Sequence, residues 1–299
     1  MQNLQLLLQA PVFNVQLLLD GLFIGAIFAL AAFGLALVWG VMNIINVAQG
    51  EFVMLGGFVT LMLAEAGFHP LLGIPAAAIV LFVLGWGLYR LVIWRIVDGD
   101  MFISLLATFG ISIMMQQLMN EIFGADVRTV ESGLGVWFLF DGMVTVTQVK
   151  VAAFFLSIVI GLLLWLFLKN ARLGQAIRAT AQNARAARIL GVDTDRVYAM
   201  TYAINAALCG AAGALVVMAW SIHPYMGLPY TLRSFMIVIV AGLGNLAGVI
   251  AAGLGLGVAE QYAGFLLGAE FQLAFVFLLL VAVLVARQIA LARKRQYLK

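Results

Sequence analysis

The sequence predicts an all-α polytopic membrane protein with about nine transmembrane helices, or eight if one segment is re-entrant. Hydrophobic residues make up 65% of the 299 residues and charged residues only 10%, and the mean hydropathy is +1.12. A soluble domain carries about 25% charged residues, and a membrane span needs about 20 apolar ones. We therefore expect residues 1–299 to form a single transmembrane domain. The N-terminus lacks a basic leader, so no cleavable signal peptide is expected.

The chain divides into apolar runs separated by short polar or glycine-containing turns. After an amphipathic lead at 1–20, the expected spans are 22–41, 52–63, 71–94, 101–123, 150–168, 198–220, 228–243, 246–265 and 271–286. The turns fall at 65–70 and 98–100. The longer loop at 124–149 contains short β-prone runs separated by glycines. The segment 228–243 is shorter than a full span, so it either crosses in a broken form or re-enters.

The distribution of basic residues decides between eight and nine crossings. Segment 169–196 holds six Lys or Arg against two Asp, and the tail 287–299 holds five Lys or Arg. Basic segments beside spans stay in the cytoplasm, so an even number of crossings must separate these two. Nine crossings satisfy this requirement, with the N-terminus outside and the C-terminus cytoplasmic. In that topology 169–196 is a cytoplasmic loop, 287–299 is a cytoplasmic tail, and 228–243 is a short crossing.

A polar stretch between the first two spans is the strongest candidate for a functional site. Hydrocarbon strongly disfavours unpaired polar groups, so this stretch must face protein or water. We predict that it forms a pathway or gate element near the cytoplasmic end of the first span, with a contribution from the second helix break. The candidate residues are Asn43, Asn46, Gln49, Gly50, Glu51 and Asn245. Two alternatives stay open: the stretch is only a loop, or Glu51 is only a favourable charge in the first turn of the next helix.

The basic loop is expected to contain a surface helix at 175–190, bracketed by Gly174 and Gly191. Ile177, Ala181, Ala184 and Ile189 fall on one apolar face of such a helix. This pattern favours docking on a partner protein, and the alternative is attachment to anionic lipid. The candidate coupling residues are Arg178, Ala181, Gln182, Arg185, Arg188 and Gly191.

The sequence gives no reason to expect an enzyme. His69 and His223 each lie beside a proline at an expected turn, and neither belongs to a metal-ligand pair. No phosphate-binding loop or nucleophile elbow is found, and the single Cys209 lies in an apolar run. No metal site, bound cofactor or nucleic-acid partner is expected. Three classes remain: a subunit of an ATP-driven transporter, a secondary transporter that uses Glu51 or Glu260, and a channel for a small neutral solute.

Three blocks carry a resemblance to a known family. The stretches 43–57, 172–192 and 242–248 resemble, in order, three segments of bacterial branched-chain amino acid ABC transporter permeases of the LivH type. Gln49 stands where many relatives carry His, and Asn245 where many carry Ser. These differences leave urea or short amides as alternative substrates, because importers for those compounds share much of the signature.

The resemblance implies one of two membrane subunits of an importer in the bacterial plasma (inner) membrane. The implied partners are a sister permease subunit, two ATP-binding cassette subunits that hydrolyse ATP and an external substrate-binding protein, besides membrane lipid. The implied mechanism is alternating access, in which the partners move the 175–190 helix.

Overall fold

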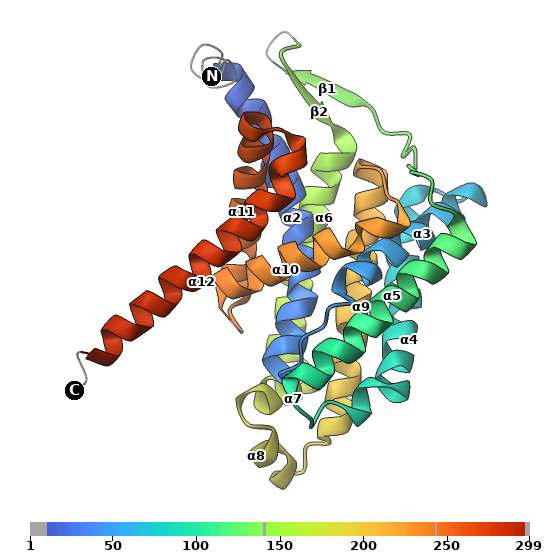
Figure 1. Ribbon diagram of the computed structural model, residues 1–299. Helices are drawn as coiled ribbons and strands as arrows, with labels where there is room; N and C mark the ends of the chain where they lie inside the picture. The colour runs from blue at the N-terminus through green and yellow to red at the C-terminus, as the bar shows by residue number, and fades with distance from the viewer. Residues whose placement is uncertain (1–10, 140–141, 243, 297–299) are drawn as a thin grey trace.

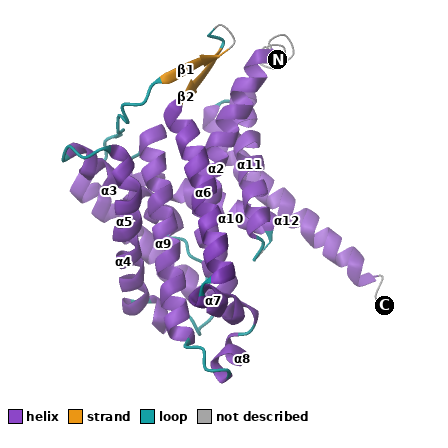
Figure 2. Cartoon of the chain, turned by 180° about the vertical axis from the view of Figure 1, so that it is seen from behind, coloured by secondary structure: helices purple, strands orange, loops and turns teal. Residues whose placement is uncertain are grey.

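The computed structural model describes residues 11–139, 142–242 and 244–296, and this part of the chain is almost entirely helical (Figures 1 and 2). The α-helices are α2 (Pro11–Met42), α3 (Gln49–Glu65), α4 (Gly73–Leu91), α5 (Met101–Phe123), α6 (Gln148–Asn170), α7 (Arg172–Gln182), α8 (Ala184–Ile189), α9 (Thr194–Ala219), α10 (Gly227–Ala241), α11 (Leu246–Leu267) and α12 (Gln272–Gln296). Four 3-10 turns accompany them: η1 (Pro70–Leu72), η2 (Ile93–Arg95), η3 (Pro224–Met226) and η4 (Ala269–Phe271).

Seven helices in the described part of the chain are long and apolar enough to cross a membrane. The two other apolar helices, α3 and α10, contain only 17 and 15 residues. Each of the nine apolar runs that the sequence indicates contains a helix, and α10, the helix of the 228–243 run, is short as expected. Some bounds were wrong: α2 begins at Pro11, so half of the expected lead is the start of a 32-residue helix, and α3 begins at Gln49 rather than at 52.

The helices α2 and α9 form the centre of the bundle, and most of their residues are buried. Glycine contacts bring the backbones close together, as is common between helices in lipid. A methyl group on Gly21 or Gly25 of α2 would overlap the backbone of α11, and one on Gly56 of α3 would overlap that of Gly210 in α9. These contacts fix α3 and α11 against the central pair.

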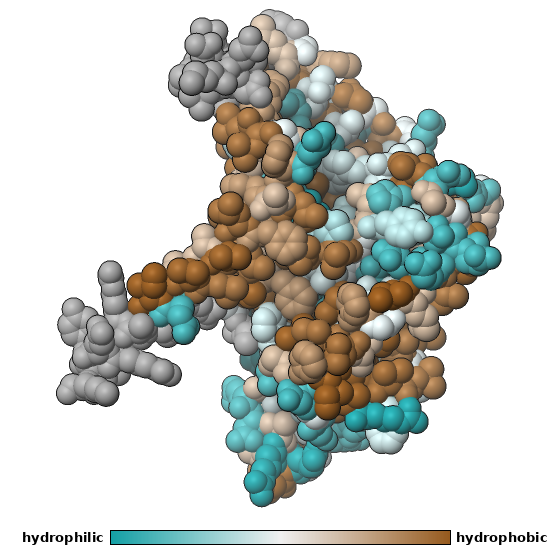
Figure 3. Space-filling view, in the orientation of Figure 1, coloured by the Kyte–Doolittle hydropathy of each residue, from teal (hydrophilic) through white to brown (hydrophobic). Residues whose placement is uncertain are grey.

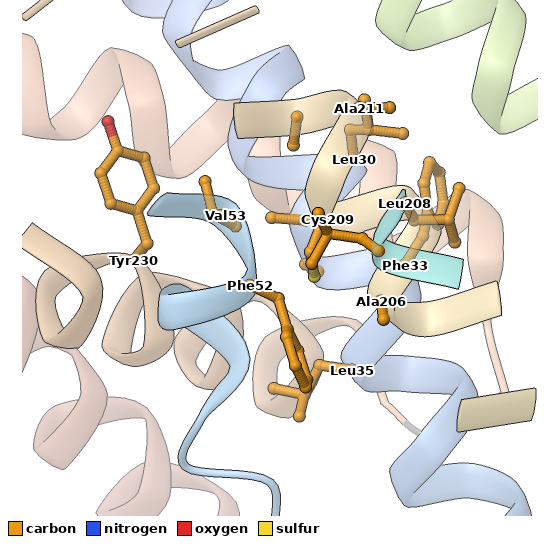
Figure 4. Close-up of a cluster of buried hydrophobic side chains, with 14 of the residues drawn as sticks. Leu30, Phe33, Leu35, Phe52, Val53, Ala206, Leu208, Cys209, Ala211 and Tyr230 are labelled. Atoms are coloured by element: carbon orange, nitrogen blue, oxygen red, sulfur yellow. The ribbon is translucent and has the colours of Figure 1, made fainter. Parts of the chain in front are cut away.

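Apolar side chains fill the remaining interior. Figure 4 shows Phe52 and Val53 of α3 beside Cys209 of α9 and Leu30 of α2. The ring of Phe52 meets that of Tyr202 edge-on at 5.9 Å between centroids. Between helices in lipid, such side chains stabilise the bundle through close van der Waals packing rather than through their removal from water.

The loop between α5 and α6 departs from the all-α expectation. It contains a two-stranded antiparallel hairpin, β1 (Val136–Leu139) and β2 (Val144–Thr147), within the β-prone part of the loop. Val144 and Val146 are buried against Phe23 of α2. Figure 1 shows the hairpin at the same end of the bundle as the start of α2, and α7 and α8 at the other end.

The 169–196 segment also differs from the expectation, because it contains two helices rather than one. Asn183 leaves the helical conformation after α7 and caps α8, since its Oδ1 accepts a hydrogen bond from the N–H of Ala186 at 3.0 Å. The expected apolar face does not form. Ile177 is buried, whereas Ala181 is exposed and Ile189 is 79% exposed.

Candidate functional site

The helix α3 begins inside the bundle rather than at its end. Asn43 adopts a left-handed conformation, with φ of 54°, and its N–H still bonds to the carbonyl of Trp39. This is a common way to end a helix. The chain then turns back, and the Nε2 of Gln49 donates to the carbonyl oxygen of Ala31 at 2.8 Å. Ala31 lies eleven residues before the end of α2, which is about 16 Å of helix.

The non-helical segment 43–48 needs partners for its backbone groups, because no water is present in hydrocarbon to satisfy them. Hydroxyl groups of neighbouring helices supply these partners. The N–H of Ile45 donates to Ser104 Oγ at 3.3 Å, and the N–H of Val47 donates to Thr108 Oγ1 at 3.1 Å. Thr108 also donates to the carbonyl of Ile45 at 2.9 Å. The helix α5 therefore stabilises the interruption between α2 and α3.

The first turns of α3 and α10 meet at this depth. A methyl group on Gly50 would overlap the carbonyl of Gly227, the first residue of α10. Thr231 of α10 binds both sides of the start of α3: its Oγ1 accepts from the N–H of Gly50 at 2.8 Å and donates to the carbonyl of Val47 at 3.0 Å. We call Asn46, Gln49, Gly50, Glu51, Gly227 and Thr231 the central junction.

Polar side chains are buried on one side of the central junction. Asn46 and Gln49 are both 0% exposed. The Nδ2 of Asn46 donates to Gln49 Oε1 at 3.2 Å, and Gln49 Nε2 also contacts the Sγ of Cys209 at 3.0 Å. The Oδ1 of Asn46 has no hydrogen-bond partner among the described residues. This network links the interruption to both central helices.

Glu51 lies on the other side of the central junction and is 1% exposed. Its Oε1 accepts a hydrogen bond from Ser112 Oγ at 3.2 Å, and its Oε2 has no hydrogen-bond partner among the described residues. The carboxyl group lies directly against Gly227, where a side chain would overlap it. Glu51 is therefore in the first turn of α3 and beside the first residue of α10, two positions that favour a negative charge.

A second buried carboxyl group, that of Glu260 in α11, has a cationic partner. Arg233 of α10 donates through Nε to both carboxylate oxygens, at 3.1 and 2.9 Å, and also through Nη2. The guanidinium lies over the rings of Phe28 and Tyr230, at 4.9 and 5.6 Å. This ion pair fastens α10 to α11 and α2. Glu260, one of the two acids considered for a secondary transporter, is therefore paired with a cation.

The other sequence-predicted residues lie outside the central junction. Asn43 is exposed at the end of α2. Asn245 caps α11 after the second helix break, where its Oδ1 accepts from the N–H of Gly248 at 3.0 Å. Gly191 ends α8 with a φ of +88°. The candidate stretch thus begins at the end of α2, as expected, but its polar part reaches further into the bundle than we expected.

Sequence reasoning missed several residues of the site. The hydroxyls of Ser104, Thr108 and Ser112 recur every fourth position, so they share one face of α5. All three are buried, and this spacing in an apolar span was a usable signal. Thr231 and Arg233 were also missed, because they lie in a segment whose path was uncertain.

Comparisons with known proteins show the family of the chain. The family model described as branched-chain amino acid transport system / permease component matches residues 17–284. The chain is 30% identical over 284 residues to the high-affinity branched-chain amino acid transport system permease protein LivH of Salmonella typhimurium, covering 90% of this chain and 92% of that one. It is 29% identical to BraD of Pseudomonas aeruginosa, covering 91% and 94%. No solved structure matches the chain.

The membrane-length helices of the described chain, the two short helices that meet at a buried polar junction and the family match together identify a multi-pass permease of the inner membrane. The chain belongs to the family of permease components of branched-chain amino acid transport systems. The resemblance indicated by the three sequence blocks is confirmed.

Proposed function

We propose that this protein is one of two membrane subunits of an ATP-driven importer for branched-chain amino acids, and that the central junction is the barrier in its pathway. The observation that supports this proposal is the meeting of two short helices inside the bundle of a chain from a permease family. Discontinuous helices place their ends at substrate sites in many transporters. The chain binds no cofactor in this scheme, and ATP is hydrolysed by partner subunits.

In this proposal the protein crosses the membrane nine times. The non-helical segment 43–48 followed by α3 makes one crossing, and the segment 220–226 followed by α10 makes another. The start of α2 and the β hairpin lie outside, α7 and α8 lie in the cytoplasm, and α12 continues into the cytoplasmic tail. The ends occupied by these elements in Figure 1 and the basic residues of 169–196 support this orientation.

The helix α8 is the proposed contact with an ATP-binding subunit. Ile189 and Leu190 are 79% and 84% exposed at the tip of the 169–196 segment, and Figure 3 shows hydrophilic side chains around this end of the molecule. Exposed aliphatic side chains surrounded by polar ones are typical of an interface. The neighbouring α7 is fixed to the bundle by the buried Ile177 and contacts α2 and α9. A displacement of α8 would therefore be transmitted through α7 to these two helices.

The sister permease is proposed to pack near α12. This helix diverges from the rest of the bundle (Figure 1), and its apolar side chains are mostly exposed. Leu278 and Val281 are among these exposed side chains. A single helix that leaves the bundle gains stability when it packs against a second subunit or lipid.

Reconstitution tests the proposed function. The chain is placed in proteoliposomes with its sister permease and ATP-binding subunits, and the substrate-binding protein and labelled leucine are added outside. We expect uptake that requires ATP and the binding protein and is not reduced by excess urea. Uptake that persists without ATP, or that urea abolishes, would contradict the proposal.

Two charge-introducing variants separate coupling from assembly. Leu190→Asp is expected to reduce both uptake and stimulated ATP hydrolysis at least tenfold, because a charge enters the apolar contact. Phe68→Asp changes another exposed apolar residue, in the turn after α3, and should leave both rates within twofold. Equal rates in the two variants would remove α8 from the coupling contact.

A further inference from the structure

A deep groove opens on the side of the bundle between α2, α6, α7 and α11. It has a volume of about 1200 Å³, larger than the 300–1000 Å³ that is usual for small-ligand sites. Its walls are mainly aliphatic and aromatic, with contributions from Phe33, Leu37, Ile158, Leu162, Trp165 and Ile250. We call it the Lys169 groove.

The dimensions of the Lys169 groove match one leaflet of a bilayer. Along α6 it extends from Ile158 to Lys169, and these eleven residues of helix rise about 16 Å. The hydrocarbon core of a bilayer is about 30 Å thick, so one leaflet is about half of that. Ile158 and Leu162 are partly exposed on the outer surface of the bundle, where lipid chains reach them.

The charged residues of the Lys169 groove all lie at its polar end. Lys169 and Arg178 line it, and none of the described residues that line it is acidic. The Nη2 of Arg178 donates to the backbone carbonyl of Lys169 at 3.3 Å, which holds the Arg178 guanidinium beside the end of α6. The Nζ of Lys169 lies 4.8 Å from the ring centre of Trp165. Within the described part of the chain neither cation has a carboxylate within 4 Å.

We propose that the Lys169 groove binds one anionic phospholipid, with its acyl chains along α2 and α6 and its headgroup phosphate between Lys169 and Arg178. Basic pockets between transmembrane helices bind anionic headgroups, and an aromatic side chain near the headgroup is typical of the membrane interface. The lipid would then contact both α2 and α7, the helix beside the proposed coupling contact.

Native mass spectrometry of the purified transporter tests this proposal. The complex is equilibrated in nanodiscs of phosphatidylglycerol and phosphatidylcholine. The lipids that stay bound to the protein after it is released from the nanodisc are then counted. We expect the wild type to retain phosphatidylglycerol preferentially. The double variant K169Q/R178Q should lose this preference by a factor on the order of 30, because each basic residue near a membrane surface contributes about fivefold.

The double variant R172Q/R196Q is the matched control. It removes two exposed basic residues from the same loop, and neither lines the Lys169 groove. It should keep the wild-type preference. An equal loss in both double variants would mean a general charge effect and would overturn the proposal, as would a wild type with no preference.

Two further measurements test whether lipid chains fill the groove. Gly40 lines it, and a methyl group there would meet nothing within 4 Å, so we expect Gly40→Phe to fold, place its ring in the groove and reduce lipid retention. A photo-crosslinking residue at position 162 should label lipid. Crosslinking to another protein subunit instead would show that the groove is a protein interface and would overturn the proposal.

Discussion

The two buried carboxyl groups of this permease have opposite surroundings. Glu260 receives three hydrogen bonds from Arg233, and its charge is fully neutralised by that cation. Glu51 has one hydrogen bond, from Ser112, and its Oε2 has no hydrogen-bond partner among the described residues. The first group joins α10 to α11, whereas the second lies where α10 meets α3.

This difference indicates how α10 is held. One side of the helix is fixed by a strong ion pair, and the other side rests on close backbone packing and single hydrogen bonds. The contact of α10 with α3 therefore depends on close packing of the two backbones, whereas its contact with α11 depends on the ion pair. In a helix that opens a pathway, we expect the side with fewer bonds to separate and the side with the ion pair to act as the pivot.

The largest effect is expected from adding a methyl group on the α3 side. Gly50→Ala should abolish uptake and reduce the amount of folded protein severely, because the added carbon overlaps the carbonyl of Gly227. Gly255→Ala is the control on the α11 side, where a methyl group would meet nothing within 4 Å. It should fold normally, since alanine favours a helix by about 0.5–1 kcal/mol over glycine. Membrane expression and uptake measure both variants, and normal uptake by Gly50→Ala would disprove the tight contact.

The ion pair should have the next largest effect. Glu260→Gln or Arg233→Gln alone leaves one charge buried without its partner, which costs about 3–5 kcal/mol. The double variant should recover part of this loss, because neither charge is then left alone. Thermal unfolding of the purified protein measures all three. Additive losses in the double variant would show that the two residues do not stabilise each other.

Removal of one hydroxyl on the α3 side should have a smaller effect on stability. Thr231→Val keeps the shape but leaves the N–H of Gly50 and the carbonyl of Val47 without this partner. An unsatisfied buried group costs about 1–3 kcal/mol. Thr201→Val is a matched control in α9, where the buried hydroxyl bonds only to the carbonyl of Val197 one turn earlier. A loss in Thr231→Val no larger than in this control would contradict the assigned role.

Neutralising Glu51 should change stability least and still change transport. A charge at a helix N-terminus contributes about 0.3–1 kcal/mol, so Glu51→Gln should express at the wild-type level. Because two helix starts face this group, the balance between closed and open junction should shift, and the initial uptake rate should change threefold to tenfold. If Glu51→Gln loses as much thermal stability as Glu260→Gln, the two carboxyl groups do not differ in the way proposed.

The positions of the helices could be predicted from the sequence, since each span is a long apolar run bounded by polar or glycine-containing turns. The fourth expected span, 101–123, matches α5 residue for residue. The main error in the loop was the prediction of one continuous helix through Asn183. An asparagine between two alanine-rich runs gives no periodic signal that a helix stops and restarts there. Helix propensity alone favoured continuity.

The residues of the central junction could be predicted only in part. Asn46, Gln49 and Glu51 stood out because they lie between two apolar runs with no loop around them, and polar side chains are rare within the membrane. Their depth and their partners depend on how far the chain turns back after Asn43, and on which helix faces α3. Both are set by tertiary packing, so Thr231 and Gly227, which come more than 170 residues later, could not be linked to Gly50.

The most direct test of the central claim is the accessibility of position 46 during transport. Asn46→Cys is introduced together with Cys209→Ala, and a small thiol reagent is applied to the complete reconstituted transporter with and without ATP, leucine and the binding protein. If the central junction is the barrier in the pathway, the thiol is protected at rest and labelled at least tenfold faster during turnover. Equal labelling in both conditions, in a variant that still transports leucine, would contradict the account.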